Sequence, residues 1–354
     1  MKTLLIAGGG TGGHVLAGIA LAQEWLAIHG TGARVQFVGA VGGLEEKLVP
    51  KNGFTLDVLN IGALNRVSKL RRFKTIYQLP LALLKSVVLF FKYRPDAVIG
   101  VGGYASGPMV LVSALFGKLF GTRTAILEQN SVAGFTNRIL SKFVDRVFLA
   151  LPIEKTSFSP SKIKITGNPI RNQLAPLASP GFDPFTLFIF GGSQGAMGIN
   201  TLIIQALPFL KKYKMKFIHQ TGVNDYERVK AAYTEQNLNA RVEKFIDQMP
   251  ECYKESTLIV CRAGSSTLAE LAAVGRAAIF VPLPTAADNH QETNAKIFTT
   301  HGAGWLLSQT DSNGEKMAAL IGGLVENHQY ILDASEKVKQ FYKPHASRDL
   351  IHFL

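Results

Sequence analysis

Two segments of this chain, one in each half, run from an apolar strand directly into a glycine-rich loop. The first passes from Leu4–Ala7 into Gly8–His14, and the second from Leu187–Phe190 into Gly191–Gly195. A strand that opens through glycines into a helix lets backbone N–H groups approach an anionic ligand at the helix N-terminus. The duplication predicts two α/β domains with a ligand-binding cleft between them, and 354 residues suffice for two cores.

Further apolar strands alternate with helical stretches in both halves, which is typical of doubly wound parallel sheets. The expected strands are Val35–Val38, Ala97–Gly100, Ala125–Leu127 and Val147–Leu149, then Lys216–His219, Thr257–Cys261 and Ala278–Val281. A break near Ile165–Arg171, followed by the proline-rich stretch Pro176–Pro184, marks the linker. We therefore expect two Rossmann-like domains, 1–165 and a second that begins at 166.

The net charge of +13 requires an explanation, and its distribution offers one. No acidic residue occurs from Val58 to Pro95. The basic residues in this stretch are Arg66, Lys69, Arg71, Arg72, Lys74, Lys85, Lys92 and Arg94, and apolar residues are interleaved with them. Basic residues beside an apolar helical face are typical of a segment that lies in an anionic membrane interface. A core helix behind a solvated basic loop is the alternative. Nucleic acid is disfavoured because no recognised reading module accompanies the patch.

Cysteine and metal-ligand patterns exclude several classes of protein. The only cysteines are Cys252 and Cys261, too few for a disulfide framework and without metal-ligand spacing, which favours a reducing cytoplasm. We expect no protein-bound metal, because Asp-x-Asp and His-x-x-His are absent. No segment offers about 18 uninterrupted apolar residues, so we do not expect a transmembrane helix.

The first glycine loop matches the pattern G-x-G-x-x-G at Gly8, Gly10 and Gly13. A dinucleotide site would also need an acid at the end of the second strand, and none occurs before Glu45. The loop instead carries Thr11 and His14 at a helix start, where the helix dipole favours a neutral imidazole that can accept a proton. The alternative for a single histidine is a structural role.

Two more loops follow strands of the first half, at Gly102–Pro108 and Glu128–Ser131. Loops at the carboxyl ends of parallel strands line one crevice. We expect Ser106 and Ser131 simply to cap helices, whereas Glu128, Gln129 and Asn130 form a denser polar group than capping needs.

The strongest local signal in the second half is Cys261–Glu270. A buried strand breaks at Gly264, and Ser265, Ser266 and Thr267 occupy the helix start, which predicts an N-cap and a diphosphate cradle. Glu270 lies one to two turns into the helix, placed to accept hydrogen bonds from a ribose diol. The alternative is a capping box of Thr267 with Glu270.

The loop Asp288–Asn294 offers side-chain amides that are suited to binding sugar hydroxyls. The alternative is that it is an ordinary loop.

In order and spacing, these motifs resemble those of the N-acetylglucosamine transferases of peptidoglycan synthesis, in glycosyltransferase family 28. The similar segments run nearly end to end and comprise Gly9–His14, Gly102–Pro108, Glu128–Asn130, Ala133–Arg138, Gly167–Arg171, Gly191–Gly195, Phe245–Asp247, Cys261–Glu270 and Gln291–Ala295. The resemblance implies a GT-B fold and an inverting transfer of N-acetylglucosamine (GlcNAc) from UDP-GlcNAc. The acceptor would be the C4 hydroxyl of the muramyl sugar in undecaprenyl-pyrophosphoryl-MurNAc-pentapeptide (lipid I), and the product lipid II.

The resemblance also assigns domains and ligands. Domain 1–165, with a C-terminal helix at about 336–354 packed back on it, would receive lipid I and dock on the membrane, and domain 166–335 would hold UDP-GlcNAc. The implied donor-binding residues are Thr11, Gly12, Gly13, Asn130, Arg171, Ser193, Ile246, Ser265, Ser266, Thr267, Leu268, Ala269, Glu270 and Gln291. The Ile246 backbone would contact uracil and Glu270 the ribose. The implied acceptor-binding residues are Thr11, Gly12, Gly13, Tyr104 and Asn137.

An inverting transfer needs a base for the acceptor hydroxyl and stabilisation of the departing UDP. Our hypothesis is that His14 is the base, with Glu128 as the competing candidate, and that Ser265, Ser266 and Arg171 stabilise the leaving group. The expected membrane-docking residues are Arg71, Arg72, Phe73, Lys74, Leu83 and Leu84. The implied location is the cytoplasmic face of the bacterial inner membrane, as a peripheral protein. The sequence leaves open whether Mg²⁺ bound to the substrates' phosphates takes part. It also leaves open whether the protein binds other proteins of cell-wall synthesis or division.

Three rivals stay open at this point: a UDP-GlcNAc 2-epimerase, a lipid glycosyltransferase with a diacylglycerol acceptor, and a non-catalytic nucleotide-sugar binder. The epimerase would share the architecture and the donor but would need no lipid-docking face. The chain departs from the family pattern at Val15–Gly18 and at Leu127, where an aromatic-proline pair and a histidine are usual. Both departures fall on the acceptor side.

Overall fold

The computed structural model describes residues 2–62, 69–153, 156–171, 173–192 and 194–354, and no side chains at 69–74. Backbone contacts divide the chain into two compact units. Unit 1 comprises Met1–Asn172 and Lys343–Leu354, and unit 2 comprises Gln173–Tyr342. These boundaries fall a few residues after the positions that the sequence suggests.

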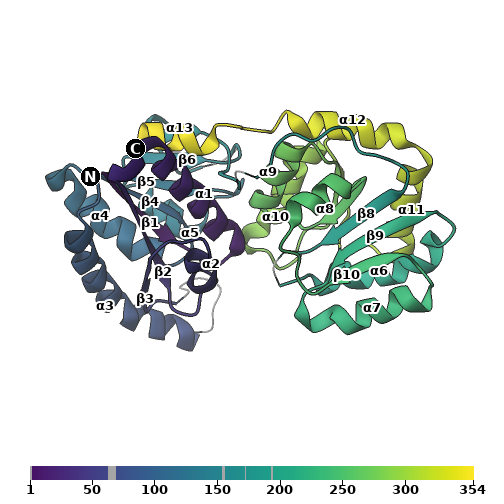
Figure 1. The fold of residues 1–354 in the computed structure, drawn as a ribbon. Coiled ribbons are helices and arrows are strands. Elements are labelled where there is room, and N and C mark those ends of the chain that lie inside the picture. Colours follow the sequence, from purple (N-terminus) through teal and green to yellow (C-terminus); the bar gives the residue numbers. More distant parts are fainter. Residues whose placement is uncertain (1, 63–68, 154–155, 172, 193) are drawn as a thin grey trace. The chain divides into compact units, whose positions relative to one another are not determined.

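Unit 1 is built on a parallel sheet, seven-stranded over the described residues, in the order β3-β2-β1-β4-β5-β6-β7. The strands are β1 (Lys2–Gly8), β2 (Ala33–Ala40), β3 (Leu56–Leu59), β4 (Ala97–Gly102), β5 (Arg123–Glu128), β6 (Arg146–Leu149) and β7 (Ile163–Ile165). The helices are α1 (Gly12–His29), α2 (Glu45–Lys51), α3 (Lys69–Tyr93), α4 (Ser106–Phe120), α5 (Phe135–Leu140) and α13 (Ala346–Phe353). The central strands are largely apolar because both faces of the sheet are covered by helices (Figure 1).

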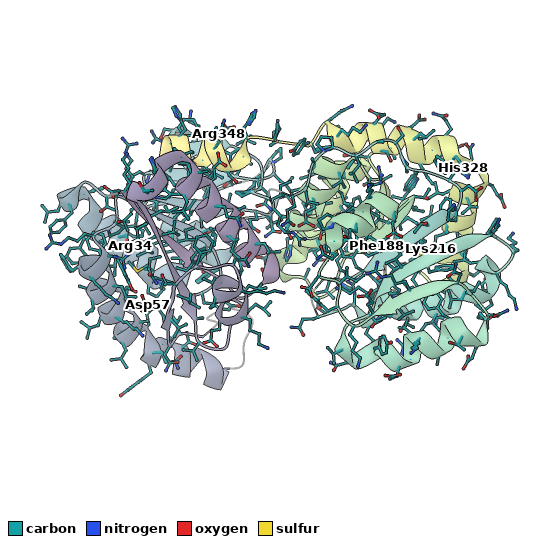
Figure 2. The ribbon with its side chains drawn as sticks, viewed as in Figure 1. Arg34, Asp57, Phe188, Lys216, His328 and Arg348 are labelled. Carbon is teal, nitrogen blue, oxygen red and sulfur yellow. The ribbon has the colours of Figure 1, made fainter. Side chains whose placement is uncertain are left out.

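The two faces of this sheet carry separate cores, since neighbouring strand residues point to opposite sides. Leu4 and Ile6 pack with α1 and α13, whereas Leu5 and Ala7 pack with α3 and α4. At the sheet edge, Arg34 on β2 and Asp57 on β3 lie near the end of α3 (Figure 2). Asp57 accepts a 2.6 Å hydrogen bond from the Tyr93 hydroxyl, which fixes that helix end.

Unit 2 repeats the architecture with a parallel sheet, six-stranded over the described residues, in the order β10-β9-β8-β11-β12-β13. The strands are β8 (Phe185–Phe190), β9 (Met215–Gln220), β10 (Ala240–Glu243), β11 (Leu258–Cys261), β12 (Ala278–Phe280) and β13 (Trp305–Leu306). The helices are α6 (Met197–Leu210), α7 (Tyr226–Glu235), α8 (Met249–Glu255), α9 (Ser265–Val274), α10 (His290–Thr299), α11 (Gly314–Glu326) and α12 (His328–Lys339). The predicted pair of doubly wound parallel sheets is confirmed.

The C-terminal segment differs from the single helix expected at about 336–354. It forms α12, which belongs to unit 2, and α13, which packs on α1 in unit 1. Pro344 lies between them, and proline has no N–H to donate and clashes with the preceding turn. Leu350 and Ile351 of α13 are buried in the core beside α1.

Candidate active site

The strand order places the glycine loops of each unit at its topological switch point. In unit 1, the order reverses between β1 and β4, and in unit 2 between β8 and β11. Loops at such a point leave the sheet in opposite directions and open a crevice at the carboxyl ends of the strands. In unit 1 the two loops touch, because the Gly9 N–H donates to the Gly102 carbonyl over 3.0 Å.

A buried carboxylate that the sequence reasoning did not assign lies under the first glycine loop. Glu45, at the start of α2, is 1% exposed and accepts 2.8 Å hydrogen bonds from the N–H groups of Gly10 and Ala40. A side chain at Gly9 would overlap this carboxylate, and Gly9 also has a φ of +156°. One N–H group of the loop is therefore already occupied by the protein, which makes the loop unlike a dinucleotide-binding loop.

The structure places His14 in the first turn of α1, beside both glycine loops. Thr11 is the N-cap of α1, and its hydroxyl accepts from the His14 N–H over 3.4 Å. The imidazole Nδ1 lies 3.1 Å from the Gly9 carbonyl, which can only accept, so the neutral ring carries its proton on Nδ1 and its lone pair on Nε2. Nε2 faces Gly102, where an added Cβ would lie 2.7 Å away. The residue is half-buried.

Glu128 ends β5 and organises the loop that follows it. One of its carboxylate oxygens accepts from the Asn130 N–H at 3.1 Å, and the other accepts from the Gly134 N–H and the Asn137 amide, both at 2.8 Å. Both Glu128 and Asn137 are buried. The side chain of Tyr104, by contrast, is 45% exposed in the loop after β4. Glu128 thus accepts from two donors of the loop after β5 and one on α5.

In unit 2, α9 begins at Ser265 and its N-cap is Gly264, which has no side chain to cap with. The expected N-cap hydroxyl is therefore wrong, and so is the capping-box alternative, because Thr267 lies inside the first turn. Ser265, Ser266 and Thr267 surround a helix N-terminus whose N–H groups point outward, which suits a diphosphate. Leu268 is buried and Ala269 half-buried behind them.

The predicted ribose carboxylate, Glu270, is 6% exposed on α9. Its Oε2 accepts a 2.8 Å hydrogen bond from the hydroxyl of Tyr253, a fully buried residue of α8. The sequence reasoning missed this partner because the two residues lie on different helices.

Gln220, at the end of β9, is a second residue that was missed. Its amide donates to the Gly192 carbonyl at 2.8 Å and accepts from the Ile246 N–H at 3.0 Å. It thereby ties the glycine loop after β8 to the segment expected to meet uracil. Because the Ile246 N–H donates to Gln220, the carbonyl is the backbone group of Ile246 that suits a uracil N–H.

The loop after β12 is held by two further side chains. Gln291 accepts from the Leu283 N–H at 2.9 Å. Arg262, which is 8% exposed, donates to the carbonyls of Val281 and Pro282 and to the Gln309 side chain. Burial lowers the pKa of Arg262 to about 10, so this guanidinium is still charged at neutral pH. It fixes the ends of β11 and β12 side by side.

Several predicted residues cannot be placed. Arg66 and Ser193 lie outside the described residues, and the side chains of Arg71, Arg72, Phe73 and Lys74 are not described. Asn130 and Arg171 are half-buried in unit 1. Among the described residues, no group of three or more His, Cys, Asp or Glu could hold a metal ion.

An apolar surface covers the outer side of α3 and α4, which pack against each other. Its exposed residues are Ile76, Tyr77, Leu81, Leu84, Val88 and Phe91 on α3, and Leu115, Leu119 and Phe120 on α4. We call these residues the α3–α4 face. Phe91 joins the helices, with its ring 5.5 Å from that of Phe120. Leu83, which the sequence suggested for docking, is half-buried and packs on the core instead, whereas Leu84 is 63% exposed.

By length and composition alone, the part of α3 over Thr75–Tyr93 could cross a membrane. Only 28% of it is buried within the structure. The buried part includes Leu89 and Phe90, which belong to the core of unit 1. The exposed lysines Lys85, Lys92 and Lys118 belong to the same two helices.

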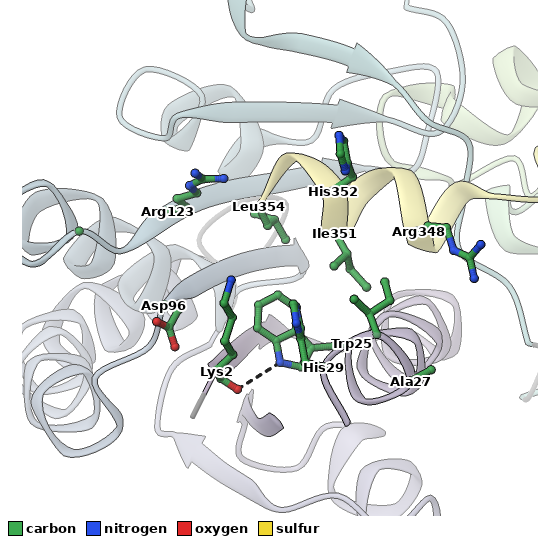
Figure 3. A pocket seen from close by; sticks show the side chains of 12 residues that line it. Lys2, Trp25, Ala27, His29, Asp96, Arg123, Arg348, Ile351, His352 and Leu354 are labelled. Atoms are coloured by element: carbon green, nitrogen blue, oxygen red, sulfur yellow. Dashed lines mark hydrogen bonds between the residues drawn. The ribbon is translucent and has the colours of Figure 1, made fainter. Parts of the chain in front are cut away.

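A cavity of about 700 Å³ in unit 1 lies away from these loops (Figure 3). It is lined by Lys2 and Arg123, the first residues of β1 and β5, and by Trp25, whose indole N–H donates to the Lys2 carbonyl at 3.3 Å. It therefore opens at the amino ends of the strands, opposite the glycine loops, and we do not assign it to the active site.

Comparisons with known proteins agree with the geometry. Residues 4–149 match the glycosyltransferase family 28 N-terminal domain, and residues 186–350 match the C-terminal domain of the same family. The chain is 41% identical over 353 residues to the UDP-N-acetylglucosamine--N-acetylmuramyl-(pentapeptide) pyrophosphoryl-undecaprenol N-acetylglucosamine transferase of Syntrophus aciditrophicus, covering 98% of this chain and 96% of that protein. It is 39% identical to the Myxococcus xanthus protein of the same name, covering 99% and 91%.

Solved structures give the same result. The crystal structure of Acinetobacter baumannii MurG matches with a TM-score of 0.79 and 31% identity, covering 100% of this chain and 99% of that one. A UDP-GlcNAc 2-epimerase from Neisseria meningitidis, bound to UDP-GlcNAc, has a TM-score of 0.64 at 14% identity and covers 99% of both chains. At that identity it shows a shared fold only. The resemblance drawn from the sequence motifs is confirmed.

Proposed function

Because the chain belongs to glycosyltransferase family 28 and is a UDP-sugar glycosyltransferase, we propose that it transfers GlcNAc from UDP-GlcNAc to the C4 hydroxyl of MurNAc in lipid I. The transfer inverts the anomeric centre and yields lipid II. The observation that carries this proposal is the similarity over nearly the whole chain to transferases named for this reaction.

The donor site that we propose lies in unit 2, at the start of α9. The outward N–H groups and the hydroxyls of Ser265, Ser266 and Thr267 bind the diphosphate and stabilise the departing UDP. Glu270 accepts from the ribose hydroxyls, and the Ile246 carbonyl accepts from uracil. Gln291 uses its amide oxygen for Leu283, so its amide N–H group is the one that donates to a sugar hydroxyl.

The base that we propose is His14 in unit 1. With Nδ1 donating to the Gly9 carbonyl, Nε2 is the atom that takes the proton from the acceptor hydroxyl. Glu128 suits this role less, because its two oxygens already accept from three N–H groups, two in the loop after β5 and one on α5. Thr11, Gly12, Gly13 and Tyr104 stay our predictions for the lipid I pyrophosphate and sugar, and Asn130 and Arg171 for the donor.

We further propose that the protein is peripheral on an anionic membrane surface, at the cytoplasmic face. The α3–α4 face exposes apolar side chains next to lysines, the combination that suits the headgroup region. A lipid-linked acceptor would reach unit 1 from that surface. Burial of the inner side of α3 in the core favours this placement over a membrane span.

The direct test is incubation with radiolabelled UDP-GlcNAc and a short-chain lipid I analogue, with analysis of the lipid product. We expect a labelled disaccharide-lipid with inverted linkage. Conversion of the donor to UDP-ManNAc without transfer would instead support the epimerase alternative, which shares the fold. A product formed on diacylglycerol but not on lipid I would replace the acceptor in our proposal.

A further inference from the structure

The environment of Glu270 contains one feature that the donor-site proposal does not use. The Tyr253 hydroxyl donates to Glu270 Oε2 at 2.8 Å, and both side chains are buried. A carboxylate out of water needs hydrogen-bond donors, and a tyrosine hydroxyl supplies one without adding a positive charge. The tyrosine hydroxyl thus holds one carboxylate oxygen of Glu270 from the side of α8.

Both the ring and the backbone carbonyl of Tyr253 have packing or hydrogen-bond partners. Its ring meets the rings of Phe188 and Phe190 edge-on, at centroid distances of 5.9 and 6.1 Å, and Phe188 lies on β8 within the sheet of unit 2 (Figure 2). Its carbonyl accepts from Ser256 Oγ at 2.9 Å and from Arg276 Nε at 3.1 Å. Because the ring and the backbone of Tyr253 are both fixed, its hydroxyl oxygen is held in one position, within hydrogen-bond distance of Glu270.

Arg276 extends this support. It is 3% exposed and donates to the carbonyls of Ala178, Tyr253 and Lys254. Burial lowers its pKa, and its contacts here are backbone carbonyls. The guanidinium therefore clamps the end of α8 from which Tyr253 projects.

We propose that Tyr253 is a positioning residue for recognition of the donor's ribose. By holding one oxygen of Glu270, it fixes the plane of the carboxylate, and the hydrogen bonds from a ribose diol depend on that plane. This inference rests on the proposed donor site, because it assumes that Glu270 accepts from ribose.

The test compares two ligands, UDP and 2′,3′-dideoxy-UDP, by titration calorimetry on the full chain. The wild-type protein should bind UDP more tightly by about tenfold or more, since a site built for hydroxyls rejects an analogue that lacks them. Tyr253→Phe removes one oxygen atom and should reduce this preference at least about threefold, mainly through weaker binding of UDP. Steady-state kinetics should show the same loss in the donor KM rather than in kcat.

A matched control is Tyr233→Phe, which removes a buried hydroxyl of the same unit that faces His219 rather than Glu270. It should leave the ligand preference unchanged. The reference variant is Glu270→Ala, which should abolish the preference, and adding Tyr253→Phe to it should change nothing further. The UDP affinity of the double variant shows whether the effect of Tyr253→Phe passes through Glu270, and circular dichroism of each variant checks that the fold is retained.

The outcomes separate the two proposals. If Glu270→Ala loses the preference and Tyr253→Phe retains it in full, the positioning role is wrong and the donor site stands. If Glu270→Ala retains the preference, or the wild-type protein does not distinguish the ligands, the ribose assignment fails and the positioning role fails with it. If Tyr253→Phe acts equally with and without Glu270, its effect is general packing and our inference is overturned.

Discussion

The two units share one topology but treat a buried glutamate beside the ligand-binding loops in different ways. In unit 1, both oxygens of Glu45 accept backbone N–H groups, one of them from the glycine loop itself. In unit 2, Glu270 is held by the hydroxyl of Tyr253, and the N-cap of its helix is Gly264, which has no side chain. The same sheet order therefore supports a glycine loop held by a carboxylate in unit 1 and, in unit 2, the helix start at which we propose that the donor's diphosphate binds.

This comparison assigns different tasks to the two units. Unit 1 carries the proposed base and the proposed docking face, so we expect its variants to alter turnover, folding stability or membrane binding. Unit 2 carries the proposed donor groups and a fully buried histidine in its core, so we expect its variants to alter donor binding or the pH dependence of its stability. The four predictions that follow test this division, from the largest expected effect to the smallest.

The largest effect is expected for His14→Ala. Removal of a general base lowers kcat by about 10²–10⁴-fold, while UDP affinity should stay within about twofold of wild type. Single-turnover assays with the lipid I analogue and UDP calorimetry measure the two quantities. Near-normal turnover would exclude His14 as the base and bring Glu128 forward.

Glu45→Gln should destabilise unit 1. The glutamine keeps one acceptor oxygen but turns an NH₂ group toward a backbone N–H of Gly10 or Ala40, at a cost of about 1–3 kcal/mol of unfolding free energy. Urea unfolding followed by circular dichroism measures it. The control is Glu46→Gln on the same helix, whose carboxylate accepts from the exposed Gly42 N–H at 3.1 Å. This substitution should cost less than about 0.5 kcal/mol. Equal costs for both variants would show that Glu45 has no special role.

The stability of unit 2 should depend on pH through His219. Burial lowers the pKa of His219 to about 3, against 6.5 for the free side chain, although nearby Asp225 raises it slightly. As pH falls below 6.5, His219 binds a proton in the unfolded chain but stays neutral in the folded chain. The contribution of neutral His219 to the free energy of unfolding is therefore complete above pH 6.5. It is lost as pH falls toward 3, by up to about 1.4 kcal/mol per pH unit.

His219→Gln removes that titration while offering a donor and an acceptor to Asn200 and Tyr233, the two partners of the ring. The difference in unfolding free energy between wild type and variant should shrink by about 1.6 kcal/mol from pH 6.5 to pH 5. A difference that stays constant over this range would show that His219 is not the titrating group.

The smallest effect is expected on the α3–α4 face. Replacing the exposed Leu81 and Leu84 by serine should weaken binding to vesicles containing anionic phospholipid by about tenfold, since each side chain loses apolar contact with the membrane. The control pair is Leu26 and Ile28, which are exposed on α1, on the other side of the sheet. If both pairs weaken binding equally in a sedimentation assay, the α3–α4 face is not the docking surface.

Much of the fold could be predicted, because the apolar runs that indicate buried strands involve only residues that are close together in the chain. Long apolar strands such as Leu187–Phe190 are buried on both faces and therefore read as continuous apolar runs. The edge strands β3, β7 and β13 were not predicted, since two to four residues give no pattern that rises above the loops around them. The break between α12 and α13 could have been found from Pro344 alone.

The residues of the candidate site likewise divide into those set by local sequence and those set by contacts between distant segments. Glycines, the Thr11 cap and the position of His14 follow from residues close together in the chain, so the sequence alone determines them. The partners of Glu45, Glu270 and Gln220 come from other elements, brought together only when the sheet orders its strands and the helices pack on it. A hydrogen bond across such a distance depends on geometry of about an ångström, which no spacing along the chain encodes. The tertiary structure alone decided which buried polar groups pair with each other.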